Sequence, residues 1–181
     1  MSVIQTDRVK LRELNFDDAE FILELLNETG FIRYIGDKGV RDIAAACDYL
    51  EQGPIDSYAR NAFGLYAVCL RKGQAHQVMD GKPIGICGLV KREGLSDPDL
   101  GFAFLSRYWS KGYALESAAA VLTHARDVLR LQRVVAITSP DNTRSIALLH
   151  KTGFKFERKV RLLDHSPELD LFAHLSFGSR A

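Results

Sequence analysis

Long hydrophobic runs are missing from this sequence of 181 residues. No apolar stretch reaches the roughly 18–20 residues that a helix needs to cross a bilayer. The amino-terminal segment also lacks the basic start and the long apolar stretch of a secretion signal. We therefore expect a protein of the cytoplasm that has no membrane partner.

Cysteine is scarce, and neither sign of charge is in excess. Cys47, Cys69 and Cys87 stand apart within apolar runs, with no C-x-x-C pair. This spacing argues against a disulfide framework or a structural zinc site and predicts free, buried thiols. Lys and Arg total 24 against 23 Asp and Glu, so no overall basic surface suggests direct contact with nucleic acid.

The amino-terminal third shows clear periodicities. Polar and apolar residues alternate over 7–14, which predicts a strand. Asn15, with Asp18 three residues on, is typical of a capping box that starts a helix over 16–28. A second helix is expected over 41–52, and Gly53-Pro54 is expected to end it.

The rest of the chain alternates between strand-like and helix-like segments. We predict strands at 62–71, 82–91, 99–105 and 133–139, helices at 114–129 and 142–152, and a final hairpin of strands at 154–163 and 168–177. The order β-α-α-β-β-β-α-β-α-β-β predicts an α/β or α+β fold in which helices flank one mixed sheet. The chain, residues 1–181, is expected to be a single domain.

The loop that follows the strand at 99–105 is the most informative segment. Residues 104–117 read F-L-S-R-Y-W-S-K-G-Y-A-L-E-S, an apolar strand end, a Lys-Gly turn and then a helix. Such a loop can leave several backbone N–H groups unpaired at the positive end of a helix dipole, which suits a phosphate-bearing ligand. Gly112 and Ala114 would let an anion approach the main chain closely. Neither G-x-x-x-x-G-K-[ST] nor G-x-G-x-x-G occurs in the chain, so this is not a nucleotide P-loop or a dinucleotide fingerprint.

The loop is similar to a known signature. Residues 109–114, W-S-K-G-Y-A, resemble the pyrophosphate-binding signature [QR]-x-x-G-x-[GA] of the GCN5-related N-acetyltransferases, the GNAT superfamily. Residues 108–116, Y-W-S-K-G-Y-A-L-E, resemble the RimJ/RimL-like ribosomal-protein acetyltransferase branch, whose version reads approximately Y-W-G-K-G-Y-A-x-E. Ser110 stands where that branch usually has glycine.

The resemblance extends over nearly the whole chain. Downstream, residues 142–154 match the family's N-x-x-S-x-x-x-x-x-K-x-G-F, from Asn142 through Ser145 to Phe154. Upstream, T-D-R-V-K-L-R-E-L at residues 6–14 resembles the opening strand of the same branch. The resemblance implies the GNAT fold and the transfer of an acetyl group from acetyl-CoA to an amine, with no metal.

The resemblance also implies where acetyl-CoA binds. The strands at 99–105 and 133–139 resemble the pair that splays apart in this fold, with the pantetheine arm between them as an added strand. Lys111 either adds a charge for the pyrophosphate or is a solvated turn residue, and Asn142 is expected both to cap its helix and to bond the pantetheine. The implied binding residues are Phe102, Phe104, Leu105, Ser106, Trp109, Ser110, Lys111, Gly112, Tyr113, Ala114 and Asn142.

Residues for the chemistry are less marked. Many members of the superfamily use a tyrosine in the last helix as the acid for the thiolate, and Leu149 occupies that position here. The ribosomal branch is thought to use instead a serine early in this helix with a carboxylate from the hairpin beyond, which points to Ser145 and Asp164. Asp99, at the head of the cofactor strand, is the other candidate base, unless it is simply a solvated strand-end acid. Glu116 is expected to be structural, because a negative charge is favourable in the first turn of a helix.

The acceptor remains open at this point. In this fold the acceptor side is built from the first two helices, their loop and the final hairpin, here residues 28–40 and 161–169. A protein α-amino group titrates near 7.7–8.0, so about a tenth is neutral at pH 7 and little basic help is needed. We therefore favour acetylation of a protein amino terminus, by a monomer or a homodimer. A small amine (aminoglycoside, polyamine or amino acid) and a non-catalytic acyl-CoA-binding module are the alternatives.

Overall fold

A computed structural model describes residues 2–71, 81–163 and 166–175. These residues form an eight-stranded sheet in the order β1-β2-β3-β4-β5-β6-β8-β7. Neighbouring strands are antiparallel except β5 and β6, which run parallel. The strands are β1 (Ser2–Gln5), β2 (Val9–Glu13), β3 (Leu65–Leu70), β4 (Pro83–Val90), β5 (Asp99–Phe104), β6 (Arg133–Thr138), β7 (Lys155–Val160) and β8 (Leu169–Leu175).

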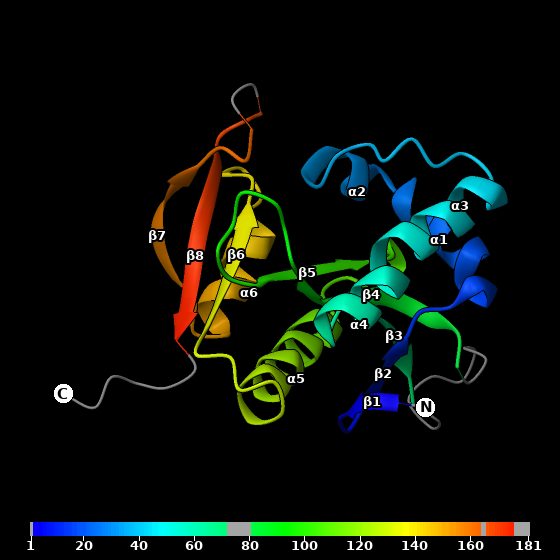
Figure 1. Cartoon of the computed structure of the whole chain (residues 1–181), viewed down its shortest axis with the longest axis horizontal. Helices are drawn as coiled ribbons and strands as arrows, with labels where there is room; N and C mark the ends of the chain where they lie inside the picture. Colours follow the sequence, from blue (N-terminus) through cyan, green and yellow to red (C-terminus); the bar gives the residue numbers. More distant parts are fainter. Residues whose placement is uncertain (1, 72–80, 164–165, 176–181) are drawn as a thin grey trace.

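Helices cover both faces of the sheet (Figure 1). They are α1 (Ala19–Leu26), α2 (Thr29–Tyr34), α3 (Ile43–Leu50), α4 (Asp56–Asn61), α5 (Tyr113–Asp127) and α6 (Thr143–Lys151), with short 3₁₀ turns at η1 (Phe16–Asp18) and η3 (Ser106–Tyr108). The first three helices pack on one face, and α5 and α6 pack on the other. This is the mixed, helix-flanked sheet that the sequence predicted.

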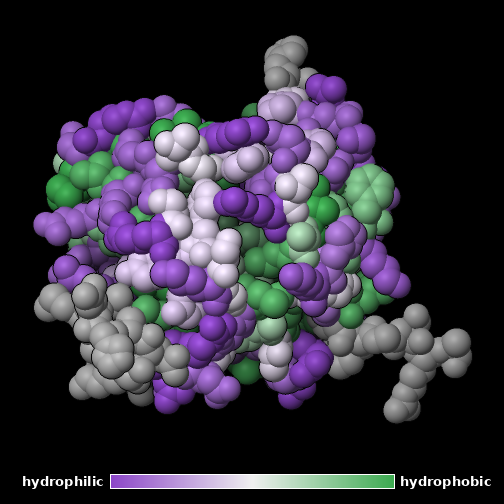
Figure 2. All heavy atoms as spheres, turned by 180° about the vertical axis from the view of Figure 1, so that it is seen from behind, coloured by the Kyte–Doolittle hydropathy of each residue, from purple (hydrophilic) through white to green (hydrophobic). Residues whose placement is uncertain are grey.

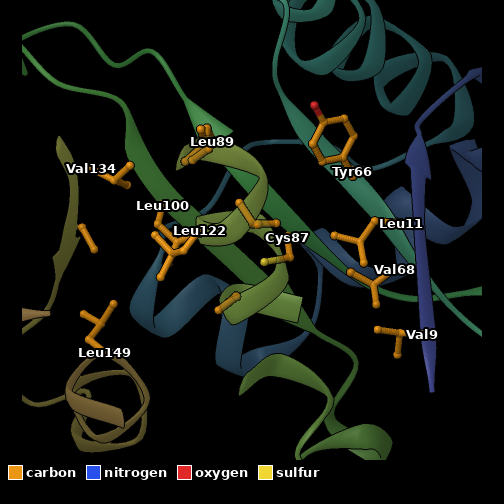
Figure 3. Close-up of a cluster of buried hydrophobic side chains, with 14 of the residues drawn as sticks. Val9, Leu11, Tyr66, Val68, Cys87, Leu89, Leu100, Leu122, Val134 and Leu149 are labelled. Carbon is orange, nitrogen blue, oxygen red and sulfur yellow. The ribbon is translucent and has the colours of Figure 1, made fainter. Parts of the chain in front are cut away.

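The alternation of side chains along the central strands explains this layering. Tyr66 and Val68 of β3 pack into the cluster beneath α5 and α6, whereas Ala67 and Cys69 pack against α1 and α3. Figure 3 shows the first cluster, in which Cys87 of β4 and side chains from β2 and β3 surround the position of α5. Because helices cover both faces, β3 is almost entirely buried, which accounts for its unbroken apolar sequence.

The amino-terminal helices differ in part from the prediction. Asn15 and Asp18 form the predicted capping box, but they cap η1, and α1 then ends at Leu26. The sequence pattern did not predict β1, α2 or α4. The predicted stop at Gly53-Pro54 is wrong, since the chain continues from α3 through a π-helical turn, η2 (Glu51–Ile55), into α4. A wider π turn relieves the clash between a proline ring and the carbonyl four residues earlier, so Pro54 remains inside the helix.

Candidate active site

β5 and β6 are paired at one end only. Their parallel register holds the single pair Asp99 with Val135, and the N–H of Val135 donates to the carbonyl of Pro98 over 2.9 Å. Each strand has six residues, so most of each strand lies beyond that pair. The two strands diverge in Figure 1, which confirms the predicted splayed pair. We call the diverging parts, residues 100–104 and 136–138, the fork.

The register determines which main-chain groups of β5 face the fork. Leu105 donates its N–H to Ile84 over 3.1 Å, so alternate residues from Asp99 to Leu105 bond to β4. Phe102 and Phe104 lie between them and turn their main-chain groups toward the fork. The Phe104 carbonyl accepts a hydrogen bond from Trp109 Nε1 over 2.6 Å. The groups left for an added strand therefore include both main-chain groups of Phe102 and the N–H of Phe104.

Two of the residues predicted to contact the cofactor already have hydrogen-bond partners within the chain. Leu105 is fully buried, and its N–H and its carbonyl are bonded to Ile84 and Tyr108. The N–H of Ser106 donates to Glu28 Oε1 over 3.2 Å, and its hydroxyl bonds the same oxygen over 3.3 Å. Leu105 therefore belongs to the core, and Ser106 joins β5 to the start of α2. Sequence alone does not reveal Glu28 as their neighbour.

The segment from Ser110 to Leu115 has the properties of an anion site. Within the described residues, none of its six successive backbone N–H groups has a hydrogen-bond partner, and the next one, at Glu116, begins the bonding of α5. Ser110 and Gly112 adopt left-handed backbone angles, with φ of 59° and 82°. The main chain therefore presents a run of donors at the positive end of a 15-residue helix. This arrangement fits a pyrophosphate.

An arginine and a glutamate hold this loop in place. Arg8, at the start of β2, donates from Nη1 to the carbonyl of Lys111 over 3.0 Å and from Nε to Glu116 over 2.6 Å. Thr6 and the N–H of Arg8 bond the other carboxylate oxygen of Glu116, over 2.5 and 3.0 Å. Burial raises the pKa of Glu116, but the hydrogen bonds from Thr6 and Arg8 outweigh it and leave the pKa below its ordinary value. The structural role predicted for Glu116 is confirmed, whereas the role of Arg8 was not predicted.

Trp109 connects the donor loop to α2 and α6. Its indole N–H is fixed on β5, and the guanidinium of Arg144 lies over its ring at 5.2 Å from the centroid. A Cβ atom on Gly30 of α2 would lie 2.5 Å from its Cη2 atom. Lys111 places its ammonium over the Tyr108 ring, 5.5 Å from the centroid. Trp109 therefore serves as a packing anchor between the end of β5, α2 and α6.

The start of α6 carries two further predicted residues. Asn142 accepts the N–H of Ser145 on Oδ1 over 3.2 Å, so it is the predicted cap. Its Nδ2 and the Ser145 hydroxyl make no hydrogen bond within the described residues, and both side chains are partly exposed. Both remain able to bond a ligand. Asp164 lies outside the described residues.

Asp99 is not the solvated strand-end acid that the sequence allowed. It is 1% exposed, and Oδ2 accepts from Arg92 Nε and Nη2 over 3.0 and 2.8 Å. Its other oxygen accepts the N–H of Ile137 over 3.2 Å. Burial raises the pKa of Asp99 to about 6, against the lowering effect of Arg92.

The acceptor side is joined to the donor side at its rim. Arg33 of α2 forms an exposed ion pair with Asp141, just before α6, at 3.3 Å. Seen from behind, hydrophobic side chains lie in a hollow near the middle of the face, between hydrophilic rims (Figure 2). Cys69 and Cys87 are buried free thiols, as predicted, and Cys47 is partly exposed. Among residues 2–71, 81–163 and 166–175, no acidic, histidine or cysteine group could hold a metal, and no helix could span a membrane.

Comparison with protein families identifies the class. The acetyltransferase (GNAT) domain model matches residues 8–155, so the chain belongs to the GNAT family. A relative called uncharacterized N-acetyltransferase p20, from Bacillus licheniformis, is 23% identical over 163 residues, which cover 89% of this chain and 86% of the relative. The chain is an acetyltransferase, and acetyl-CoA is its acetyl donor.

Solved structures share the fold at low sequence identity. RimL, a ribosomal L7/L12 α-N-protein acetyltransferase in complex with coenzyme A, has a TM-score of 0.81 at 14% identity. The matched region covers 97% of this chain and 98% of the RimL chain. The microcin C7 self-immunity acetyltransferase MccE, in complex with acetyl-CoA and AMP, has a TM-score of 0.75 at 17% identity, with 94% and 93% covered. At these identities the likeness concerns the fold alone.

Proposed function

We propose that this chain, acting in the cytoplasm, acetylates the α-amino group of a protein amino terminus, as a member of the RimJ/RimL-like branch. One observation carries the proposal. The two buried carboxylates among the described residues each form an ion pair, Asp18 with Arg12 and Asp99 with Arg92. No strong buried base is therefore left in that part of the chain, which favours an acceptor whose amine is already partly neutral at pH 7.

The charges on the acceptor side support the same choice over a polycation. Of the four carboxylates in residues 24–42, Glu24 and Asp37 are paired with Arg107 and Arg41, while Glu28 and Asp42 accept from neutral groups of Ser106 and Ala45, so only two negative charges are left without a cation. A polyamine or an aminoglycoside needs unpaired negative charge for several ammonium groups. RimL, which shares the fold, is a ribosomal-protein α-amine acetyltransferase.

A direct transfer would use residues of the donor loop, β5, α6 and the final hairpin. The N–H groups of residues 110–115 would hold the pyrophosphate, and Phe102, Phe104 and Asn142 would bond the pantetheine amides. The amine nitrogen attacks the thioester carbonyl, the carbon–sulfur bond breaks, and the thiolate leaves. Ser145 would give that thiolate a proton, and Asp164 would take the proton of the amine.

A matched set of amines tests this proposal by thiol release from acetyl-CoA. One peptide carries a free amino terminus and no lysine, and a second has a blocked amino terminus and one lysine. Spermidine and an aminoglycoside complete the set. We expect release only with the first peptide, at a rate that rises toward pH 8 as the α-amine loses its proton. Equal release with the blocked lysine peptide, or release with spermidine alone, overturns the proposal.

A further inference from the structure

At the point where β5 and β6 diverge, a side chain takes the place of a main-chain hydrogen-bond acceptor. In a parallel ladder paired at Asp99 and Val135, the next N–H of β6 to face β5 belongs to Ile137. A continued ladder would bond that N–H to a main-chain carbonyl of β5. It donates instead to Oδ1 of Asp99, over 3.2 Å.

The carboxylate is fixed in this place by a second contact. Oδ2 of Asp99 accepts two hydrogen bonds from Arg92, which follows β4, and the Asp99 side chain is 2% exposed. Two hydrogen bonds from one guanidinium fix Oδ2 and favour the charged form of the carboxylate. Both oxygens of Asp99 thus already accept hydrogen bonds and the side chain is closed off from solvent, which disfavours a role as general base.

We propose that Asp99 is a positioning residue, which ends the ladder between β5 and β6 by replacing a main-chain carbonyl and so keeps the donor fork open. An unbonded N–H on Ile137 would favour one more rung between the strands. That rung would draw in the main chain of β5 next to Phe102, whose open groups serve the pantetheine. The inference rests on acetyl-CoA as donor and is independent of which amine is acetylated.

Two substitutions at Asp99 separate this role from that of a base. Asp99→Asn keeps an oxygen for Ile137, and Arg92, whose side chain is 34% exposed, can turn its charge to water. Asp99→Ala removes the acceptor. The readouts are acetyl-CoA affinity by calorimetry, kcat at saturating acetyl-CoA, and hydrogen exchange of the Ile137 amide by NMR. The Val135 amide, bonded to Pro98, is the internal control.

For Asp99→Asn we expect acetyl-CoA affinity and kcat within about threefold of the native protein, with the Ile137 amide still protected. For Asp99→Ala we expect about tenfold weaker acetyl-CoA binding, while the Ile137 amide stays protected like that of Val135, because it now bonds the main chain of β5. A hundredfold loss of kcat in Asp99→Asn, with affinity and protection kept, would make Asp99 a base and overturn the proposal. Native acetyl-CoA affinity in Asp99→Ala would overturn it as well, and so would an Ile137 amide that exchanges freely, since no further rung has then formed.

Arg92→Gln gives a second test if Asp99→Ala does not fold. Without the guanidinium, the carboxylate loses two of its three hydrogen bonds, and Oδ1 is no longer held beside Ile137. We expect several-fold weaker acetyl-CoA binding, with kcat at saturation retained. Unchanged acetyl-CoA affinity in Arg92→Gln contradicts the positioning role.

Discussion

Around Gly112 the polar groups are backbone N–H donors in sequence, whereas around α2 they are side chains such as Arg33 and Glu28, each bonded to a distant residue. A run of N–H groups is the same whatever side chains the segment carries, provided that its backbone angles are reached. In the proposed function, the run of N–H groups recognises a ligand that does not vary, and a short motif is sufficient to encode it. The proposed acceptor side depends on which side chains meet there, so its specificity can change while the fold stays the same.

The first way to sharpen this comparison is to replace a residue proposed to act in the transfer step, between the donor and acceptor sides. Ser145→Ala removes the hydroxyl proposed to protonate the thiolate. It keeps the backbone N–H of residue 145, which donates to the capping side chain of Asn142. We expect kcat to fall by about a hundredfold, with acetyl-CoA affinity nearly unchanged. Steady-state kinetics and calorimetry measure the two quantities. Thr143→Ala, an exposed hydroxyl in the same turn, is the control, and full activity in Ser145→Ala removes this serine from the mechanism.

The second change breaks the donor loop. Gly112→Val introduces a branched side chain at a φ of 82°, with its Cβ 3.1 Å from Arg8 Nη2. We expect acetyl-CoA to bind at least tenfold more weakly, a loss of about 1.4 kcal/mol, because the N–H groups no longer converge. Gly81→Val is the matched control, with a φ of 96° and no atom near its Cβ. Equal affinity in Gly112→Val and native protein would refute the loop as the pyrophosphate site.

The third change tests the support of that loop and its dependence on pH. Glu116→Gln weakens the bonds to Thr6 and Arg8, and we expect the protein to lose about 1–2 kcal/mol of stability at pH 7. The native pKa of Glu116 is lowered, so its contribution is present above the ordinary value of 4.5 and is lost as pH falls through the native pKa. Urea unfolding of both proteins at several pH values measures this difference. A difference that grows toward acid would have the wrong sign.

The smallest effect is expected at the rim of the acceptor side. Arg33→Ala breaks an ion pair whose side chains are 64% and 58% exposed, so solvent and salt already screen it. We expect unchanged thermal stability and unchanged acetyl-CoA affinity, with at most about a threefold rise in the KM of the acceptor. A tenfold loss of acetyl-CoA affinity would show that the two sides are not separable in this way.

Local sequence signals predicted the elements that local physics controls. The Asn15 capping box, the Asn142 cap and the Gly112 turn lie where the sequence indicated, and the β5–β6 divergence lies where the family resemblance implied it. Signals that depend on the surroundings were misleading, as at Pro54, which a π turn accommodates.

Partners that are distant in the chain could not be predicted. Arg8 supports the donor loop from 103 residues before Lys111, and no spacing rule links the two. The ion pair of the buried Asp99 depends in the same way on Arg92, which lies across a turn from it. Folding brings such groups together through packing, and a single sequence carries no mark of the distance between them.

The contact between Trp109 and Gly30 has a consequence for how such enzymes can diverge. Position 30 lies on the acceptor side, yet the ring that limits its size is held by β5 through the indole N–H. A larger residue at 30 therefore requires a smaller one at 109 in the same lineage. The two positions should accordingly vary as a pair among descendants of this chain. A change of acceptor that enlarges residue 30 on α2 therefore also requires a change at residue 109, next to β5.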